Sequence, residues 1–251
     1  MRGRRQKPTL SERQLAIAWK SASLLLDYPD ERLLEQVEVL RMASHELPAP
    51  LGEPMRDLLL HLQSAPLPEL QADYVETFDT RRRNCLFLTY FAHGDTRKRG
   101  VALLRFKQTY LRSGFVLDAD SEHGGELPDH LSVVLEYAAT VDQRLGWGLL
   151  TDHRAGLELL RIALRDASSP WAGAVELVTG TLPPLRGDEM DAVRRLAAEG
   201  PPEEEVGLTP YATPAFDPGP AVPSGHAGPQ DLPMPTAGPT MNMPANLPGA
   251  R

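Results

Sequence analysis

Hydrophobic residues recur at the three- and four-residue spacing of amphipathic α-helices through most of the first 200 residues. The first helix is predicted to begin at Ser11, because a glutamine three residues later completes a capping box. Pro29 ends this element, and Asp30 is placed to cap a second helix. Two further helices are predicted to begin after Pro54 and near Pro68.

Helical stripes continue through the second half of this region. Asp95 is predicted to be the N-cap of a helix that Gly114 ends in a left-handed conformation. The inward face of that helix is expected to carry Val101, Leu104, Gln108 and Leu111. Pro128 is expected to open the next helix from its first turn. The apolar stripe over 150–164 predicts one helix, and 188–199 predicts a short last one.

These patterns predict an all-α protein, with a single globular helical bundle over residues 10–200 and no internal repeat. A short basic segment, residues 1–9, precedes the bundle and is expected to be flexible. The composition changes after Gly200, since 13 of the 24 prolines lie from Pro201 onward. Residues 201–251 contain too little apolar surface to offset the entropy of ordering them, so a disordered Pro/Gly-rich tail is predicted.

The net charge, the apolar runs and the cysteine content exclude several functional classes of protein. A formal net charge of -8 argues against nucleic-acid binding driven by bulk charge. No run approaches the ~20 apolar residues that span a bilayer, so no stable membrane insertion is expected. The arginine pair near the start is not followed by the apolar core of an export signal, which predicts a cytoplasmic protein. The single cysteine, Cys85, lies in an apolar run and is interpreted as a small buried hydrophobe.

Catalytic and metal-binding patterns are absent from the sequence. There is no dinucleotide-binding or P-loop motif, and no two histidines have the i, i+4 spacing of a helical zinc site. Glu126, Asp129 and His130 are close in sequence, but acidic residues there are better explained by the helix dipole. Glu76 and Asp79 are interpreted as a solvated face, with an acidic patch for a basic peptide as the alternative. The sequence therefore predicts no enzyme, no metal and no cofactor.

The most informative segment, residues 74–100, places two basic runs around an apolar stretch and a His-Gly-Asp turn. Arg97 and Arg99 fall in the first turn of a predicted helix, where the dipole opposes cations. An internal carboxylate such as Asp79 or Asp95 could compensate them and pin the loop to the bundle. An acidic group on a partner is the alternative.

The pattern in this segment runs from Tyr74 through Phe78-Asp79 and an arginine- and leucine-rich stretch to His93-Gly94-Asp95 and the Arg97/Arg99 pair. A second pattern covers 126–131 and contains Asp129 and His130. Together they resemble the respiratory nitrate reductase delta-subunit family, the molybdenum-cofactor assembly chaperones, over about residues 10–185. Many members have Leu-Phe-Glu-His where this chain has Thr-Tyr-Phe-Ala at 89–92, so the role of that glutamate is not carried over.

The resemblance implies an all-helical protein without catalysis of its own. Such proteins bind the catalytic (alpha) subunit of respiratory nitrate reductase, including its N-terminal segment, while the molybdenum cofactor is inserted. They also delay membrane attachment until assembly is complete. We expect helix-in-groove recognition, in which Glu76, Asp79 and Asp129 meet basic client residues. The candidate client-binding residues are Tyr74, Glu76, Phe78, Asp79, His93, Asp95, Arg97, Arg99, Asp129 and His130.

Two other functional classes stay open at this point. A helical adaptor could act through the proline-rich tail, whose only aromatic residues are Tyr211 and Phe216. A small helical enzyme would need a convergent polar pocket, for which the sequence offers no candidate set.

Overall fold

The structure is a computed structural model that describes residues 10–117 and 127–200. The predicted basic segment 1–9, Glu126 and the predicted tail 201–251 lie outside these residues. Within the described ranges the regular elements are helices, apart from an isolated bridge between Phe87 and His130, so the all-α prediction is confirmed. The elements are α1 (Glu12–Leu25), α2 (Glu31–His45), α3 (Ala49–Ser64), α4 (Leu67–Phe78), the 3₁₀-helix η1 (Arg82–Asn84), α5 (Tyr90–His93), α6 (Arg97–Arg112), α7 (Leu131–Thr140), α8 (Gln143–Asp152), α9 (Arg154–Asp166), α10 (Ala172–Thr181) and α11 (Gly187–Glu199).

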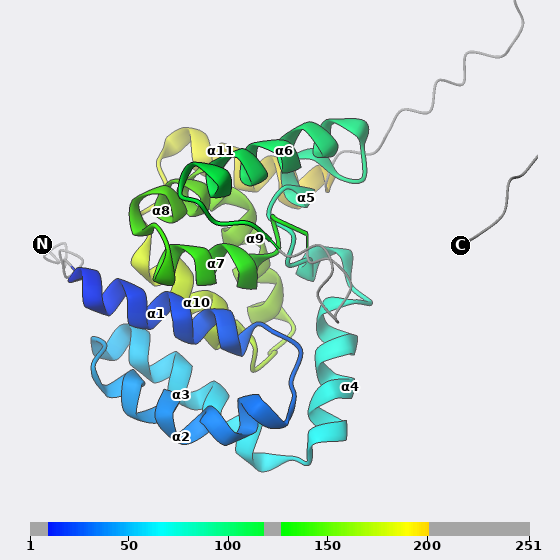
Figure 1. Ribbon diagram of the computed structural model, residues 1–251. Coiled ribbons are helices and arrows are strands. Elements are labelled where there is room, and N and C mark those ends of the chain that lie inside the picture. Colours follow the sequence, from blue (N-terminus) through cyan, green and yellow to red (C-terminus); the bar gives the residue numbers. More distant parts are fainter. Residues whose placement is uncertain (1–9, 118–126, 201–251) are drawn as a thin grey trace, which may run out of the picture. The chain divides into compact units, whose positions relative to one another are not determined.

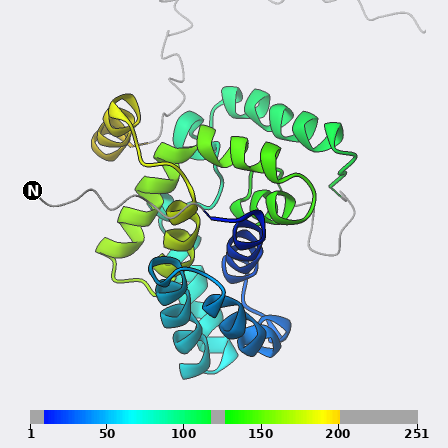
Figure 2. The ribbon, with the colours of Figure 1, turned by 90° about the vertical axis from the view of Figure 1, so that its left-hand side faces the viewer.

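Helix α1 lies between two groups of helices (Figure 1). On one side α2 and α3 pack against each other, and α3 also packs on α10. On the other side α1 packs along α7, which contacts α8. Helix α9 contacts α10, α11 and η1. The view in Figure 2, turned by a quarter, shows the same division around α1. None of the helices in the described residues is both long and apolar enough to cross a bilayer.

Two buried tryptophans mark the centre of the core. Trp19 and Trp171 are fully buried. Each indole N–H still has a partner, since Trp19 donates to the Thr181 hydroxyl at 2.9 Å and Trp171 donates to an Asp73 carboxylate oxygen at 3.0 Å. The core can therefore bury these large rings without leaving a polar atom unsatisfied.

The predicted caps of the first two helices are confirmed. Ser11 forms a capping box with Gln14, and the Asp30 carboxylate accepts a hydrogen bond from the Leu33 N–H. The third helix was predicted to begin after Pro54, and this is wrong, because α3 begins at Ala49 and Pro54 lies inside it. The residues just before Pro54 stay helical because Leu51 and Gly52 pack against neighbouring elements.

Three other predicted boundaries differ from the structure. The N-cap of α6 is Thr96 rather than Asp95. Helix α7 begins at Leu131 rather than at Pro128, because residues 127–130 form a turn that is held to the 86–88 segment by backbone hydrogen bonds. The stretch 150–164 is two helices, α8 and α9, that meet at His153. Two predictions are confirmed: Gly114 has φ +73°, and the last helix, α11, covers the predicted 188–199.

The inward face of α6 differs most from the prediction. The buried residues are Ala102, Phe106 and Tyr110. The predicted core residues Val101, Leu104 and Leu111 are instead 59%, 55% and 61% exposed. The aromatic face is buried because the Tyr110 ring packs on Tyr137, with centroids 4.6 Å apart, and the Tyr110 hydroxyl donates to the Pro128 carbonyl.

Candidate functional site

The first part of the 74–100 segment belongs to the core. Tyr74 and Phe78 are buried on α4, with ring centroids 4.7 Å apart. The Tyr74 ring also meets the Trp171 ring edge-on at 5.3 Å, and its hydroxyl donates to the Leu26 carbonyl at 2.9 Å. These two candidate residues therefore tie α4 to α10 and to the end of α1, and neither presents a surface to a partner.

The next part forms a buried polar network. Asp129 is fully buried, and its Oδ2 accepts hydrogen bonds from the Thr89 hydroxyl and from the Thr89 N–H at 3.1 Å. Arg99 lies beside this pair, with Nη2 3.9 Å from Asp129 Oδ2 and Nη1 3.2 Å from Asp95 Oδ1. The prediction that an internal carboxylate compensates a cation in the first turn of α6 is confirmed for Arg99. Asp129 was expected to meet basic client residues, but its burial leaves no surface for that contact.

An aromatic residue extends the network toward α7. The Arg99 guanidinium lies 5.1 Å from the centroid of the Phe87 ring, a cation–π contact. The other neighbour of that ring is His130, at 5.2 Å. Burial lowers the pKa of His130 below its usual value, which favours a neutral ring at pH 7. Within the ranges 10–117 and 127–200, no group of three or more His, Cys, Asp and Glu side chains is arranged to hold a metal ion.

The remaining candidates lie nearer the surface. Glu76, Asp79, Asp95 and Arg97 are exposed, and His93 is half-buried. The Glu76 carboxylate is 3.5 Å from Arg81 and lines a small polar cavity beside the end of α9. The structure therefore does not gather the ten predicted residues into one site. It divides them into buried residues that hold the segment in place and exposed charges at its edges.

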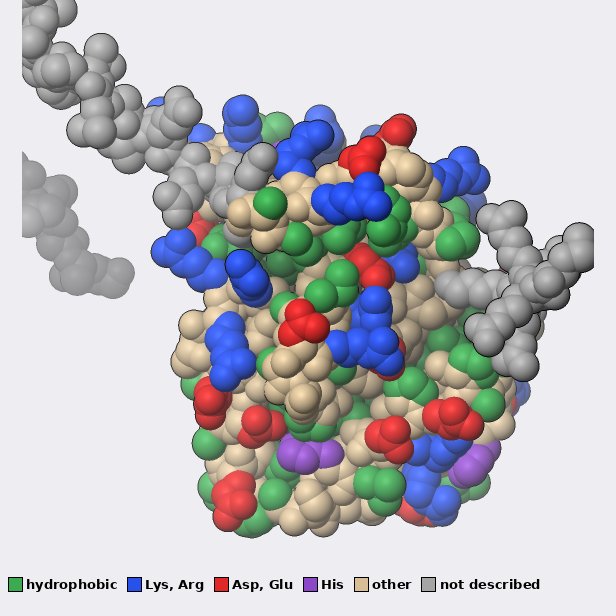
Figure 3. Space-filling view, turned by 180° about the vertical axis from the view of Figure 1, so that it is seen from behind, with side chains coloured by type: hydrophobic (Ala, Val, Ile, Leu, Met, Phe, Trp, Pro, Cys, Tyr) green, Lys and Arg blue, Asp and Glu red, His purple; other side chains and the backbone are tan. Residues whose placement is uncertain are grey.

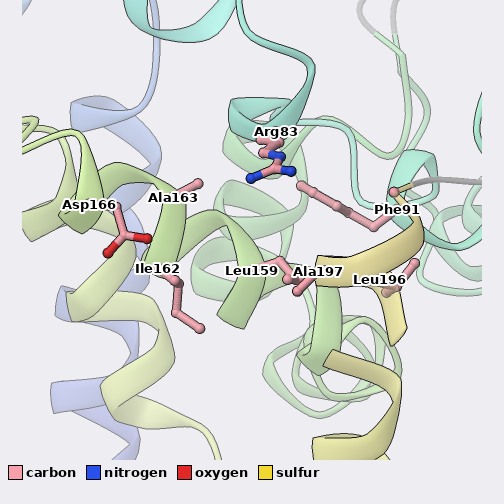
Figure 4. A pocket seen from close by; sticks show the side chains of 9 residues that line it. Arg83, Phe91, Leu159, Ile162, Ala163, Asp166, Leu196 and Ala197 are labelled. Atoms are coloured by element: carbon pink, nitrogen blue, oxygen red, sulfur yellow. The ribbon is translucent and has the colours of Figure 1, made fainter. Parts of the chain in front are cut away.

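A hollow with an apolar lining lies beside this segment, between α5, α9 and α11 (Figure 4). Phe91 from α5 contributes one wall, and Arg83 and Asp166 place opposite charges at its border. Its volume is ≈ 150 Å³. On the face of the molecule seen from behind, hydrophobic side chains lie in depressions between charged ones (Figure 3). The remaining lining residues are Leu159, Ile162, Ala163, Leu196, Ala197 and Gly200.

Local packing keeps this hollow open and apolar. Gly156 lets α9 approach α5, since a Cβ on Gly156 would lie 2.9 Å from Cδ2 of Phe91. Ile162 is 36% exposed, so an apolar side chain remains accessible on α9. Nearby, burial disfavours the Glu158 carboxylate, but hydrogen bonds from Arg161 and Arg154 outweigh it and lower the pKa of Glu158. Glu158 thus forms ion pairs with both Arg154 and Arg161 along α9.

Sequence reasoning missed the hollow. Its α9 side chains form a second apolar stripe, offset from the core stripe of Leu157, Leu160 and Leu164. That stripe was visible as a helix with more hydrophobic positions than one buried face requires. The lone Cys85 adds nothing to the site, because burial raises the pKa of its thiol to about 11 and keeps it protonated at neutral pH.

Comparison with known proteins identifies the family. The model of the family described as "Nitrate reductase delta subunit" matches residues 44–176. The chain is 42% identical over 169 residues to the nitrate reductase-like protein NarX of Mycobacterium tuberculosis H37Rv, an alignment that covers 66% of this chain and 24% of NarX. It therefore spans about a quarter of the length of that relative.

Two further relatives carry a functional name. The probable nitrate reductase molybdenum cofactor assembly chaperone NarJ of Bacillus subtilis is 29% identical over 170 residues, covering 66% of this chain and 88% of that protein. The nitrate reductase molybdenum cofactor assembly chaperone NarJ of Escherichia coli K12 is 33% identical over 159 residues, covering 62% and 65%. With the family model matching more than half of its residues, the chain belongs to the nitrate reductase delta subunit family.

Proposed function

We propose that the chain is an assembly chaperone for the catalytic (alpha) subunit of respiratory nitrate reductase. It binds that subunit in its immature form, including its N-terminal segment, assists insertion of the molybdenum cofactor and delays membrane attachment. It acts in the cytoplasm and has no catalytic activity of its own. Membership in the delta-subunit family and the names of its NarJ relatives support this proposal.

The structural observation that carries the proposal is the apolar hollow between α5, α9 and α11. Its volume, ≈ 150 Å³, equals that of a protein cavity that takes up a benzene-sized group. One leucine or aromatic side chain of a client could therefore enter it as an anchor, which is how a few buried side chains dominate many interfaces. A bound client helix would lie along the exposed side of α9.

The charges around the hollow would orient the bound client segment. The polar cavity at the C-terminal end of α9 is lined by Asp73 and Glu76, together with Arg81. Asp79 is exposed nearby at the end of α4. We propose that the apolar anchor of the client enters the hollow and that its basic residues lie toward Glu76 and Asp79.

The test is calorimetric titration of the full chain with the N-terminal peptide of the client subunit. Ile162→Asp places a charge in the hollow without emptying the core, because Ile162 is already partly exposed. Val39→Asp on α2 is the matched control, since Val39 is an aliphatic residue that is 66% exposed and does not line the hollow. We expect Ile162→Asp to weaken binding at least ~10-fold, as an uncompensated charge in an apolar contact would. Equal affinity of both variants would reject the hollow.

Two further titrations test whether Asp79 and the segment 201–251 take part in peptide binding. Asp79→Ala should weaken peptide binding while leaving the helical circular dichroism signal unchanged, because Asp79 is exposed. Deletion of residues 201–251 should leave the affinity unchanged if the helical part binds the client. Loss of binding on that deletion would instead support an adaptor that acts through the tail.

A further inference from the structure

Helix α6 carries an exposed face that the proposed chaperone site does not use. Val101, Leu104 and Leu111 point to solvent, with the exposed Gln108 on the same face, from the side opposite the buried Ala102, Phe106 and Tyr110. Val116, just after the helix, is also 69% exposed. An apolar helix face normally packs against a neighbouring element, but none of the described residues covers this one.

The charges on α6 are of one sign. Its sequence, RKRGVALLRFKQTYLR, contains six cations and no carboxylate, in a chain whose net charge is -8. Lys98, Arg105 and Arg112 recur every seventh residue along one edge of the apolar stripe, and Lys107 lies on the other edge. These four side chains make no ion pair with the described part of the chain, in contrast to Arg99. The apolar stripe is thus bordered by cations on both sides.

Position in the fold decides what can reach this face. Helix α6 lies at the edge of the helical bundle in both ribbon views (Figures 1 and 2). The stripe is a ridge, so a single partner helix laid against it would contact only α6 and bury little area. It is also only about two heptads long, too short for a stable coiled coil. A flat surface can contact the whole ridge at once.

We propose that α6 docks the protein reversibly onto an anionic membrane surface. The aliphatic residues enter the boundary between headgroups and acyl chains, and the flanking lysines and arginines reach lipid phosphates. Because the chain as a whole is acidic, this cationic face is attracted more strongly than its acidic surroundings, which favours one bound orientation. The proposal goes beyond the chaperone function and does not depend on the hollow.

Vesicle co-sedimentation of the full chain tests the proposal. The probes are phosphatidylcholine vesicles with and without about a third of phosphatidylglycerol, at low and high salt. We expect binding only to the anionic vesicles, weakened by high salt. Arg105→Gln with Lys107→Gln should lower the partition coefficient about 25-fold, at roughly fivefold per cation. Leu104→Ser with Leu111→Ser should lower it about tenfold or more.

A matched pair of changes on another helix controls for general effects. Val39→Ser with Met42→Ser alters two exposed aliphatic residues of α2 and should leave vesicle binding unchanged. Circular dichroism checks that each variant is folded, and peptide titration should be normal in the α6 variants. Absence of binding to anionic vesicles, equal binding to neutral ones, or an equal loss in the α2 control would overturn the proposal. Normal vesicle binding with failed peptide titration would contradict only the chaperone site.

Discussion

The buried carboxylate of Asp129 allows the sharpest prediction about stability. Its Oδ2 accepts two hydrogen bonds from Thr89, while its Oδ1 has no hydrogen-bond partner among the described residues. Asp129→Asn preserves the size of the side chain but removes its charge. The new amide group must also place two donors in a buried site, where Arg99 supplies only further donors.

Several costs then act together. Hydrogen bonds to a charged group are worth about 1.5–3 kcal/mol, and a buried unsatisfied donor costs about 1–3 kcal/mol. Removing one partner of a buried ion pair typically costs about 3–5 kcal/mol, and we expect Asp129→Asn to fall near the lower end, about 3 kcal/mol. Arg99 also provides an internal control through Asp95, whose side chain is 73% exposed. Asp95→Asn should cost no more than about 0.5 kcal/mol, because exposed ion pairs contribute little.

Urea denaturation followed by circular dichroism at 222 nm measures both variants against the parent chain. The midpoint should fall clearly for Asp129→Asn and hardly move for Asp95→Asn, with similar slopes for all three. If the two variants were equally stable, the reasoning that this network pins the 86–99 segment to the start of α7 would be refuted.

Three other predictions concern packing, backbone strain and pH. Gly146→Ala should destabilise the fold by about 1–3 kcal/mol, because the new Cβ would lie 2.3 Å from Cβ of Ala138; an unchanged urea midpoint would contradict this. Ser168→Gly should raise the free energy of unfolding by about 0.5–1 kcal/mol, since Ser168 has φ +53°; a lower midpoint would argue against strain there. Burial lowers the pKa of His153 below its usual value. As the pH decreases below about 6.5, His153 is therefore protonated in the unfolded chain before it is protonated in the folded one, and the free energy of unfolding decreases. His153→Gln should flatten that slope between about pH 7 and 5, leaving the part due to His130, and an unchanged slope would remove His153 as a cause.

Local signals predicted the parts of the fold that local chemistry determines. The caps at Ser11 and Asp30 depend on a few neighbouring residues, so the sequence was sufficient to locate both helix starts. The faces of α6 could not be assigned in the same way. This helix has apolar residues on two sides, and the choice between them depends on Tyr110 reaching the Pro128 carbonyl across the fold.

The candidate site could likewise not be predicted from local sequence patterns. The motif residues identified the family, yet Tyr74, Phe78 and Asp129 are buried and hold the segment in place. The hollow is assembled from Phe91, Ile162 and Leu196, which are far apart in sequence, so no spacing rule could have grouped them. Residues that define a family pattern can thus be structural, while the proposed binding surface lies beside them.

The most direct test of the account is site-specific photo-crosslinking between the folded chain and the N-terminal peptide of the client subunit. A photoreactive side chain at position 162, in place of Ile162, should crosslink to the peptide, and excess unlabelled peptide should suppress the product. The same group in place of Val39 should give no product. Crosslinking at position 39 but not at 162, under conditions where the peptide binds, would contradict the claim that the hollow between α5, α9 and α11 holds the client.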